Sequence, residues 1–111
     1  MRMPNGERAE VEIRKLRDYC LNREHPRGKN KARVFVAALN WTAENAEELQ
    51  VLLKQAASTG DAEPGERDSY GQRYVVDFPV KGPQGDVLIR SAWIIRHGED
   101  FPRLTTCYVQ E

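Results

Sequence analysis

The chain has 111 residues, and its 17 Lys and Arg residues balance 17 Asp and Glu residues, so the formal net charge is zero. With 40% hydrophobic and 31% charged residues, the composition is typical of one globular domain and excludes a disordered chain. No apolar run approaches the roughly 20 residues of a membrane helix and no signal peptide is visible, so the sequence predicts a cytoplasmic protein.

The first elements are short. Residues 9–13 alternate like a strand, and a helical face follows in which Ile13, Leu16 and Cys20 recur at helical spacing. Pro26 cannot continue a helix, so the first helical segment is expected to end before it.

Two longer helices are expected next. The spacing of Ala32, Phe35 and Leu39 predicts a helix over residues 29–39. Thr42 is a good N-cap for a third helix, because its side-chain oxygen can accept a hydrogen bond from a free backbone N–H of the first turn. Gly60 is a plausible end for that helix.

After residue 60 the hydrophobic period changes from 3.6 to 2. Residues 61–69 are interrupted by Pro and Gly, which favours an edge strand or a loop. Residues 73–80 and 86–96 alternate well and are separated by the turn residues 82–85. Residues 104–109 predict a last strand.

This order of elements predicts an α+β fold. We expect about three N-terminal helices packed on one face of a C-terminal antiparallel sheet of three to four strands. The chain is expected to be a single domain over residues 1–111, with its helical part at about 10–60 and its sheet at about 61–111.

The balanced total hides a separation of charge along the chain. Residues 14–33 hold eight Lys and Arg against two acidic residues, a net charge of +6, and residues 44–68 carry a net charge of −5. A basic block of this density can present a local anion site in a neutral protein.

The loop and helix start at residues 25–32 lie inside the basic block. Arg27, Lys29 and Lys31, together with free N–H groups at a helix start, would suit a phosphate or another anion. His25 could act as a general acid or base near neutral pH. The alternative is a solvated turn whose charges only keep the chain soluble.

A second set of candidates lies on the predicted strands. Arg90 interrupts an apolar strand, so it either faces solvent or meets an anionic partner. If the last two strands pair, Thr106 and Tyr108 could lie beside Arg90 on the sheet face that the helices leave open. The alternative is ordinary packing for Tyr108 and β-propensity for Thr106.

Other chemistry has little support in the sequence. Cys20 and Cys107 are the only cysteines, and they favour two small buried thiols rather than a metal site or a disulfide framework. Hydrolase and zinc motifs are absent. We therefore expect neither a metal nor a cofactor.

The motifs taken together resemble an uncharacterised bacterial family, a domain of unknown function. Residues 15–22 resemble its pattern KLxDYLLN, and residues 25–35 resemble HPxG followed by KAxFF. The second half of the chain resembles YGxxYVV, GPxG, RTxWII and PRLVTAYP. The chain departs from these patterns at four positions: Cys20 for Leu, Ser91 for Thr, Cys107 for Ala and Val109 for Pro.

The resemblance implies a toxin–antitoxin-like context and similarity to the barnase/EndoU/colicin/RelE group of small ribonucleases. That group cleaves RNA without metal through scattered His, Lys, Arg, Thr and Tyr side chains. Carried over to this chain, the pattern selects five catalytic candidates: His25, Lys31, Arg90, Thr106 and Tyr108.

Two functions follow as hypotheses. In the first, the protein is a toxin-like ribonuclease in which His25 exchanges the proton of the 2′-hydroxyl, Lys31 and Arg90 stabilise charge at phosphorus, and Thr106 and Tyr108 position the phosphate or a flanking base. In the second, it is a non-catalytic module that binds a small cognate protein in a two-gene pair.

Overall fold

The computed structural model describes residues 1–111, and its order of elements is the predicted α+β order. A 3₁₀ turn at Gly6–Arg8 precedes the helices, and each helix and strand is bounded as follows: α1 Ile13–Lys15, continued by a π-helical turn Leu16–Cys20; α2 Lys29–Leu39; α3 Ala46–Thr59, preceded by a 3₁₀ turn Ala43–Asn45; β1 Ala62–Arg67; β2 Gly71–Gly82; β3 Gly85–Arg96; β4 Arg103–Gln110.

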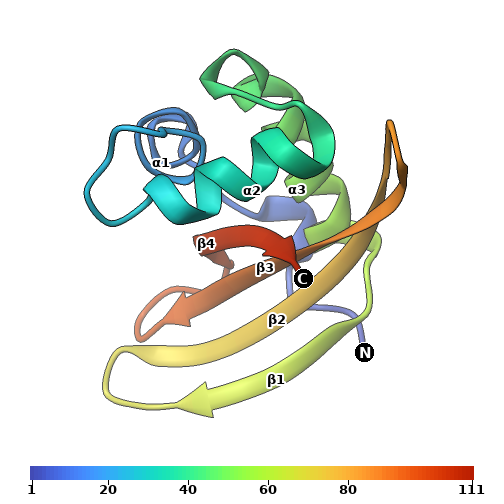
Figure 1. The fold of residues 1–111 in the computed structure, drawn as a ribbon. Helices are drawn as coiled ribbons and strands as arrows, with labels where there is room; N and C mark the ends of the chain where they lie inside the picture. The colour runs from blue at the N-terminus through green and yellow to red at the C-terminus, as the bar shows by residue number, and fades with distance from the viewer.

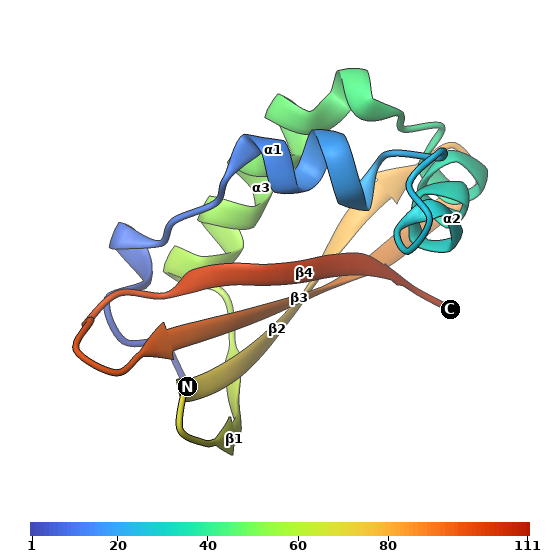
Figure 2. The same ribbon diagram turned by 90° about the vertical axis from the view of Figure 1, so that its left-hand side faces the viewer.

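The four strands form an antiparallel meander in the order β1-β2-β3-β4, and the helices gather on one side of it (Figures 1 and 2). β1, the segment with Pro and Gly, lies at one edge of the sheet, as expected for a strand that cannot make a full ladder. None of the helices combines the length and the apolar character that a membrane crossing requires.

Local signals explain the ends of α2 and α3. α2 spans the predicted residues and ends where Asn40 adopts a left-handed backbone with φ of 57°. At the start of the next helical segment the Thr42 hydroxyl accepts a hydrogen bond from Glu44 N, while Asn45 Oδ1 accepts one from Thr42 N. This reciprocal cap satisfies donors that the helix leaves free. Gly60 caps the end of α3.

The expected strand at residues 9–13 is reduced to a single bridge between Glu10 and Arg103, and α1 begins at Ile13. One reason is that the backbone of this segment has another partner. The Gln50 side chain on α3 donates to the Val11 carbonyl at 2.7 Å, which holds the segment between α3 and β4 and prevents a longer ladder.

Alternation along the strands divides the sheet into a covered face and an open face. On β3, Ile89, Ser91 and Trp93 are fully buried under the helices, whereas Arg90 between them is only half-buried. On β4 the buried residues Leu104 and Cys107 are three positions apart, because the register shifts between them. This bulge leaves two adjacent threonines, Thr105 and Thr106, between the buried residues.

Candidate functional site

Lys31, in the first turn of α2, lies at the centre of the candidate site. Its Nζ donates to Thr106 Oγ1 on β4 at 3.1 Å. The same nitrogen is 5.4 Å from the centroid of the Tyr108 ring and 5.6 Å from that of Tyr19, which are distances of cation–π contact. Lys31 is half-buried and has no carboxylate within ion-pair distance. A cation in this environment is a natural partner for an anion.

His25 is joined to the cluster through Tyr19, because the two rings meet edge-on with centroids 4.7 Å apart. Its Nδ1 accepts hydrogen bonds from the backbone N–H groups of Arg27 and Gly28, both at 3.0 Å. Since Nδ1 faces two donors, the ring proton is on Nε2, which makes no hydrogen bond to another residue. His25 therefore accepts two backbone hydrogen bonds in the loop before α2 and offers one N–H to a ligand.

Gly28 brings the loop and the π-helical turn together. A Cβ built at this position would lie 2.3 Å from the carbonyl oxygen of Tyr19. No larger residue fits this approach without a shift of the backbone, so the glycine is what allows His25 and Tyr19 to lie against each other.

Arg90 is held on the open face of β3 by Asp77 on β2. Nε and Nη2 of Arg90 each donate to a different carboxylate oxygen of Asp77 at 2.9 Å. This bidentate pair, with a smaller contribution from Tyr108, raises the pKa of Arg90 above its ordinary value. Tyr108 is the register partner of Arg90 on β4, so the guanidinium lies beside the phenol that also contacts Lys31.

Two buried thiols lie against the same cluster. Cys20, at the end of the π-helical turn, and Cys107, on β4, are free and fully buried, as the sequence predicted. A hydrogen bond from Cys107 is the main cause that lowers the pKa of Cys20 to about 6, and Thr106 and the charge of Lys31 contribute to the lowering. The same contact, together with burial, raises the pKa of Cys107.

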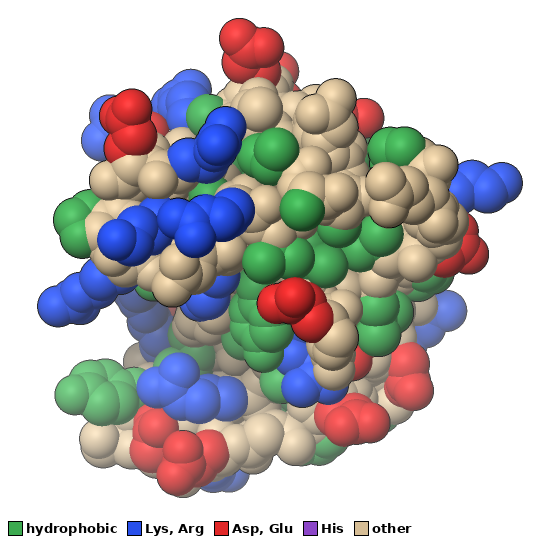
Figure 3. Space-filling model, in the orientation of Figure 1, with side chains coloured by type: hydrophobic (Ala, Val, Ile, Leu, Met, Phe, Trp, Pro, Cys, Tyr) green, Lys and Arg blue, Asp and Glu red, His purple; other side chains and the backbone are tan.

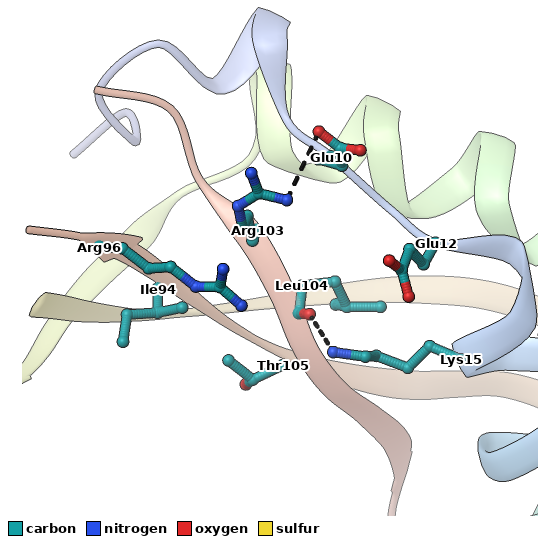
Figure 4. Close-up of a pocket in the computed structure, with 8 residues that line it drawn as sticks. All are labelled: Glu10, Glu12, Lys15, Ile94, Arg96, Arg103, Leu104 and Thr105. Atoms are coloured by element: carbon teal, nitrogen blue, oxygen red, sulfur yellow. Dashed lines mark hydrogen bonds and ion pairs between the residues drawn. The ribbon is translucent and has the colours of Figure 1, made fainter. Parts of the chain in front are cut away.

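The surface of the molecule carries a recess bordered by basic side chains (Figure 3), and a cavity lies at the start of β4. In the space-filling view a recess separates the helical part from the lower strands on the left of the molecule, and Lys and Arg side chains border it above and below (Figure 3). A cavity of about 120 Å³ lies at the start of β4, between the N-terminal segment and β3 (Figure 4).

No group of three or more His, Cys, Asp or Glu side chains is arranged to hold a metal ion.

The five catalytic candidates form one connected set. Contacts run from His25 through Tyr19 to Lys31, from Lys31 to Thr106 and Tyr108, and from Tyr108 to its register partner Arg90.

The two anion-binding candidates, Arg27 and Lys29, are exposed beside this set, and their side chains make no ion pair or hydrogen bond. Their role stays a prediction. The other histidine of the chain, His97, is not part of this set; its Nε2 contacts the Asp68 carbonyl beyond the end of β3, at 3.1 Å.

Sequence reasoning missed two members of the site, Tyr19 and Asp77. The signal for Asp77 was available: the tight turn at residues 83–84 sets the β2–β3 register, and this register pairs Asp77 with Arg90. Tyr19 had no such signal, because its contacts depend on how the π-helical turn packs against β4.

Comparisons with known proteins place the chain in context. A family model described as "Domain of unknown function (DUF6883)" matches residues 2–111. Among solved structures, one chain of a "Contact-dependent growth inhibition toxin - immunity protein complex from Klebsiella pneumoniae 342" is similar, with a TM-score of 0.60 and 14% sequence identity. The likeness covers 96% of this chain and 97% of that chain and shows a shared fold. A search of the curated proteins found no match.

Proposed function

The chain belongs to the DUF6883 family, a domain of unknown function, and from this premise we propose that it is a toxin-like ribonuclease that cleaves RNA phosphodiesters in the cytoplasm without a metal. Its fold is shared with a chain from a toxin–immunity complex, which supports a toxin-like or an immunity-like role. The arrangement of the candidate site supports the proposed cleavage of a phosphodiester.

One observation carries the proposal: five residues chosen from the sequence, distant along the chain, form a connected set around an unpaired lysine. A phosphodiester carries one negative charge and gains more at its oxygens when a nucleophile attacks phosphorus. Lys31 and Arg90 would stabilise that charge, where preorganised donors have their largest effect. The Thr106 and Tyr108 hydroxyls would hold the phosphate in place.

The geometry changes the role expected for His25. With Nδ1 occupied by two backbone donors, the imidazole is presented as an N–H donor rather than as a base for the 2′-hydroxyl. We therefore assign His25 to a hydrogen bond with a phosphoryl oxygen. The 2′-oxygen would form the new bond to phosphorus as the bond to the 5′-oxygen breaks, while water accepts the 2′-hydroxyl proton and supplies one to the 5′-oxygen.

The test is cleavage of RNA by purified protein, with and without a chelator. We expect cleavage in both conditions, and we expect Lys31→Gln to lower the rate by about 10²–10³-fold, as removal of one charge-stabilising donor does elsewhere. Lys54→Gln is the matched control, since it removes an exposed cation on α3 that lies outside the site and makes no ion pair or hydrogen bond. RNA that stays intact at stoichiometric amounts of folded wild-type protein would contradict the proposal.

A second candidate function is a non-catalytic module that binds a small cognate protein. The observation in its favour is that Arg90 and His25 are both held by internal partners, Asp77 and the backbone of the α2 start. Soluble expression that leaves growth and cellular RNA unchanged would favour this module. Arrested growth, relieved by Lys31→Gln but not by Lys54→Gln, would favour the ribonuclease.

A further inference from the structure

The cavity at the start of β4 is outside the set of residues that the ribonuclease proposal uses. It lies between the N-terminal segment, α1, β3 and β4, and Figure 4 shows polar side chains around it from each of these elements. Eight residues line it: Glu10, Glu12, Lys15, Ile94, Arg96, Arg103, Leu104 and Thr105. A space of about 120 Å³ suits one small flat group better than a large ligand.

Most of the polar groups in this cavity already have partners. Arg103 makes a bidentate pair with Glu99, at 2.9 Å for both bonds, and a longer ion pair with Glu10 at 3.7 Å. Lys15 Nζ donates to the Leu104 carbonyl at 3.0 Å.

Two charged side chains of the lining make no ion pair or hydrogen bond: the Glu12 carboxylate and the Arg96 guanidinium. Both side chains are exposed, so the cavity offers a solvent-accessible acceptor from the N-terminal segment and a solvent-accessible donor from β3, with Ile94 as an apolar part of the lining.

The cavity lies next to the Lys31 cluster. A neighbouring hollow shares Glu12, Lys15 and Thr105 with it and continues to Tyr19. Tyr19 contacts both His25 and Lys31, and Thr105 precedes Thr106 in the bulge of β4. A nucleotide whose phosphate lies at Lys31 therefore has a cavity for its base within reach.

We propose that this cavity binds a guanine base of the RNA, with Glu12 as the residue that selects it. This inference rests on the proposed function, because it names the base next to the phosphate that would be cleaved. The guanine Watson–Crick edge presents two adjacent donors, N1–H and N2–H, which fit the two oxygens of one carboxylate. Its O6 and N7 are acceptors, which suit the guanidinium of Arg96.

The other bases fit this pair of groups less well. Adenine and cytosine each place a ring-nitrogen acceptor beside their amino group, so one carboxylate oxygen would face a lone pair. Uracil offers a single N–H between two carbonyl acceptors. Glu12 therefore discriminates among the bases through both attraction and repulsion.

A binding experiment tests the cavity without relying on cleavage. Guanosine 3′-monophosphate and cytidine 3′-monophosphate are titrated into the ¹⁵N-labelled protein, and the backbone amide signals are followed by NMR. We expect the guanosine nucleotide to shift the signals of residues 10–15 and 103–105, and we expect Glu12→Gln to weaken its binding by about tenfold or more. Glu7→Gln, an exposed carboxylate outside the cavity, is the control. Equal binding of both nucleotides would overturn the proposal.

The two proposals fail in different ways. Binding of the guanosine nucleotide that Glu12→Gln weakens, in a protein that leaves RNA intact, supports the cavity and contradicts the ribonuclease. Cleavage of RNA with the same base preference in wild type and in folded Glu12→Gln supports the ribonuclease and overturns the role of Glu12. A preference for guanosine at the cut site that is lost only in Glu12→Gln supports both.

Discussion

Ser91 faces the core, but its hydrogen bonds hold together the two strands that carry Arg90 and Asp77 on the open face. It is the single polar residue among the fully buried side chains. Its Oγ donates to the Val76 carbonyl at 2.7 Å and accepts from Trp93 Nε1 at 2.8 Å. The hydroxyl thus joins β2 to β3 under Arg90 and satisfies the indole of the largest core residue.

Ser91→Ala is expected to lower the free energy of unfolding by about 1–3 kcal/mol, because the Trp93 N–H loses its buried partner. Urea unfolding followed by tryptophan fluorescence measures the change. Ser69→Ala is the control, since Ser69 is exposed in the β1–β2 turn, and this substitution should leave the midpoint unchanged. Equal midpoints for the two variants would contradict the prediction.

At the scale of single residues, the sequence indicated which side chains have useful functional groups, but it did not indicate which residues those side chains contact. Lys31 was selected as a cation in a basic loop, and nothing in the sequence showed that it would lack an acidic partner. Arg90 was expected either to face solvent or to meet an anionic partner, and the hairpin register supplied Asp77. The orientation of His25 was not predictable, because it depends on two backbone N–H groups that point at one ring nitrogen.

At the scale of elements, the site depends on the loop that leads into α2. α2 was predictable at both ends, since Pro26 and Gly28 precede it and its buried side chains recur at helical spacing. The bulge in β4 was not predictable, because Thr105 and Thr106 have the same chemistry and either could face the core. The bulge is what leaves Thr106 available to Lys31.

Gly28→Ala is expected to cost about 1–3 kcal/mol of stability, because the added methyl group would meet the Tyr19 carbonyl oxygen and the loop would have to shift. The proposed activity should fall as well, because the shift separates His25 from Tyr19. Gly65→Ala is a matched control, since its Cβ would have its closest neighbour at 3.5 Å, an ordinary contact. Thermal unfolding that gives the same midpoint for both variants would disprove the role of Gly28.

At the scale of the whole molecule, the separation of charge along the chain is kept only in part, because Glu44 and Glu47 of the acidic block line a hollow together with Arg17 of the basic block. The basic block supplies α1, the loop and the start of α2, which lie on the β4 side of the sheet, while β1 at the opposite edge carries part of the acidic block (Figure 1). The neutral total therefore says nothing about partners, and a polyanion would approach from the β4 side.

The meander itself was predictable because each strand pairs with its neighbour in the sequence. The recess was not predictable, since it depends on how the loop after the π-helical turn lies over the edge of the sheet, and no local pattern encodes that arrangement.

Acid should destabilise the whole molecule through carboxylates at one end of the sheet. The pKa of Asp68 is lowered mainly by the Tyr70 N–H, and the pKa of Glu99 is lowered mainly by the Arg103 side chain. Both carboxyl groups have a lower pKa in the folded protein than in the unfolded chain. Their ionised forms therefore stabilise the fold fully at a pH above the unfolded-state pKa. This stabilisation is lost as the pH falls through the folded-state pKa.

The double variant Asp68→Asn/Glu99→Gln should be less stable than wild type at neutral pH, and the difference should narrow below about pH 4. Urea midpoints across the pH range measure this effect. Glu63→Gln is the control, since it removes an exposed carboxylate without an ion pair. A difference that stays constant with pH would argue against these two groups.

The position of Thr106 and Tyr108 on β4 has a consequence for protein synthesis. A ribosome makes the chain from its N-terminus, so α2 and Lys31 leave the exit tunnel long before β4. Until β4 pairs with β3, Lys31 has no hydroxyl partner and Arg90 has no phenol beside it. For the proposed ribonuclease, which would be made among ribosomes and messenger RNA, this order would delay the assembly of the site until the elements from α1 to β3 have been synthesised.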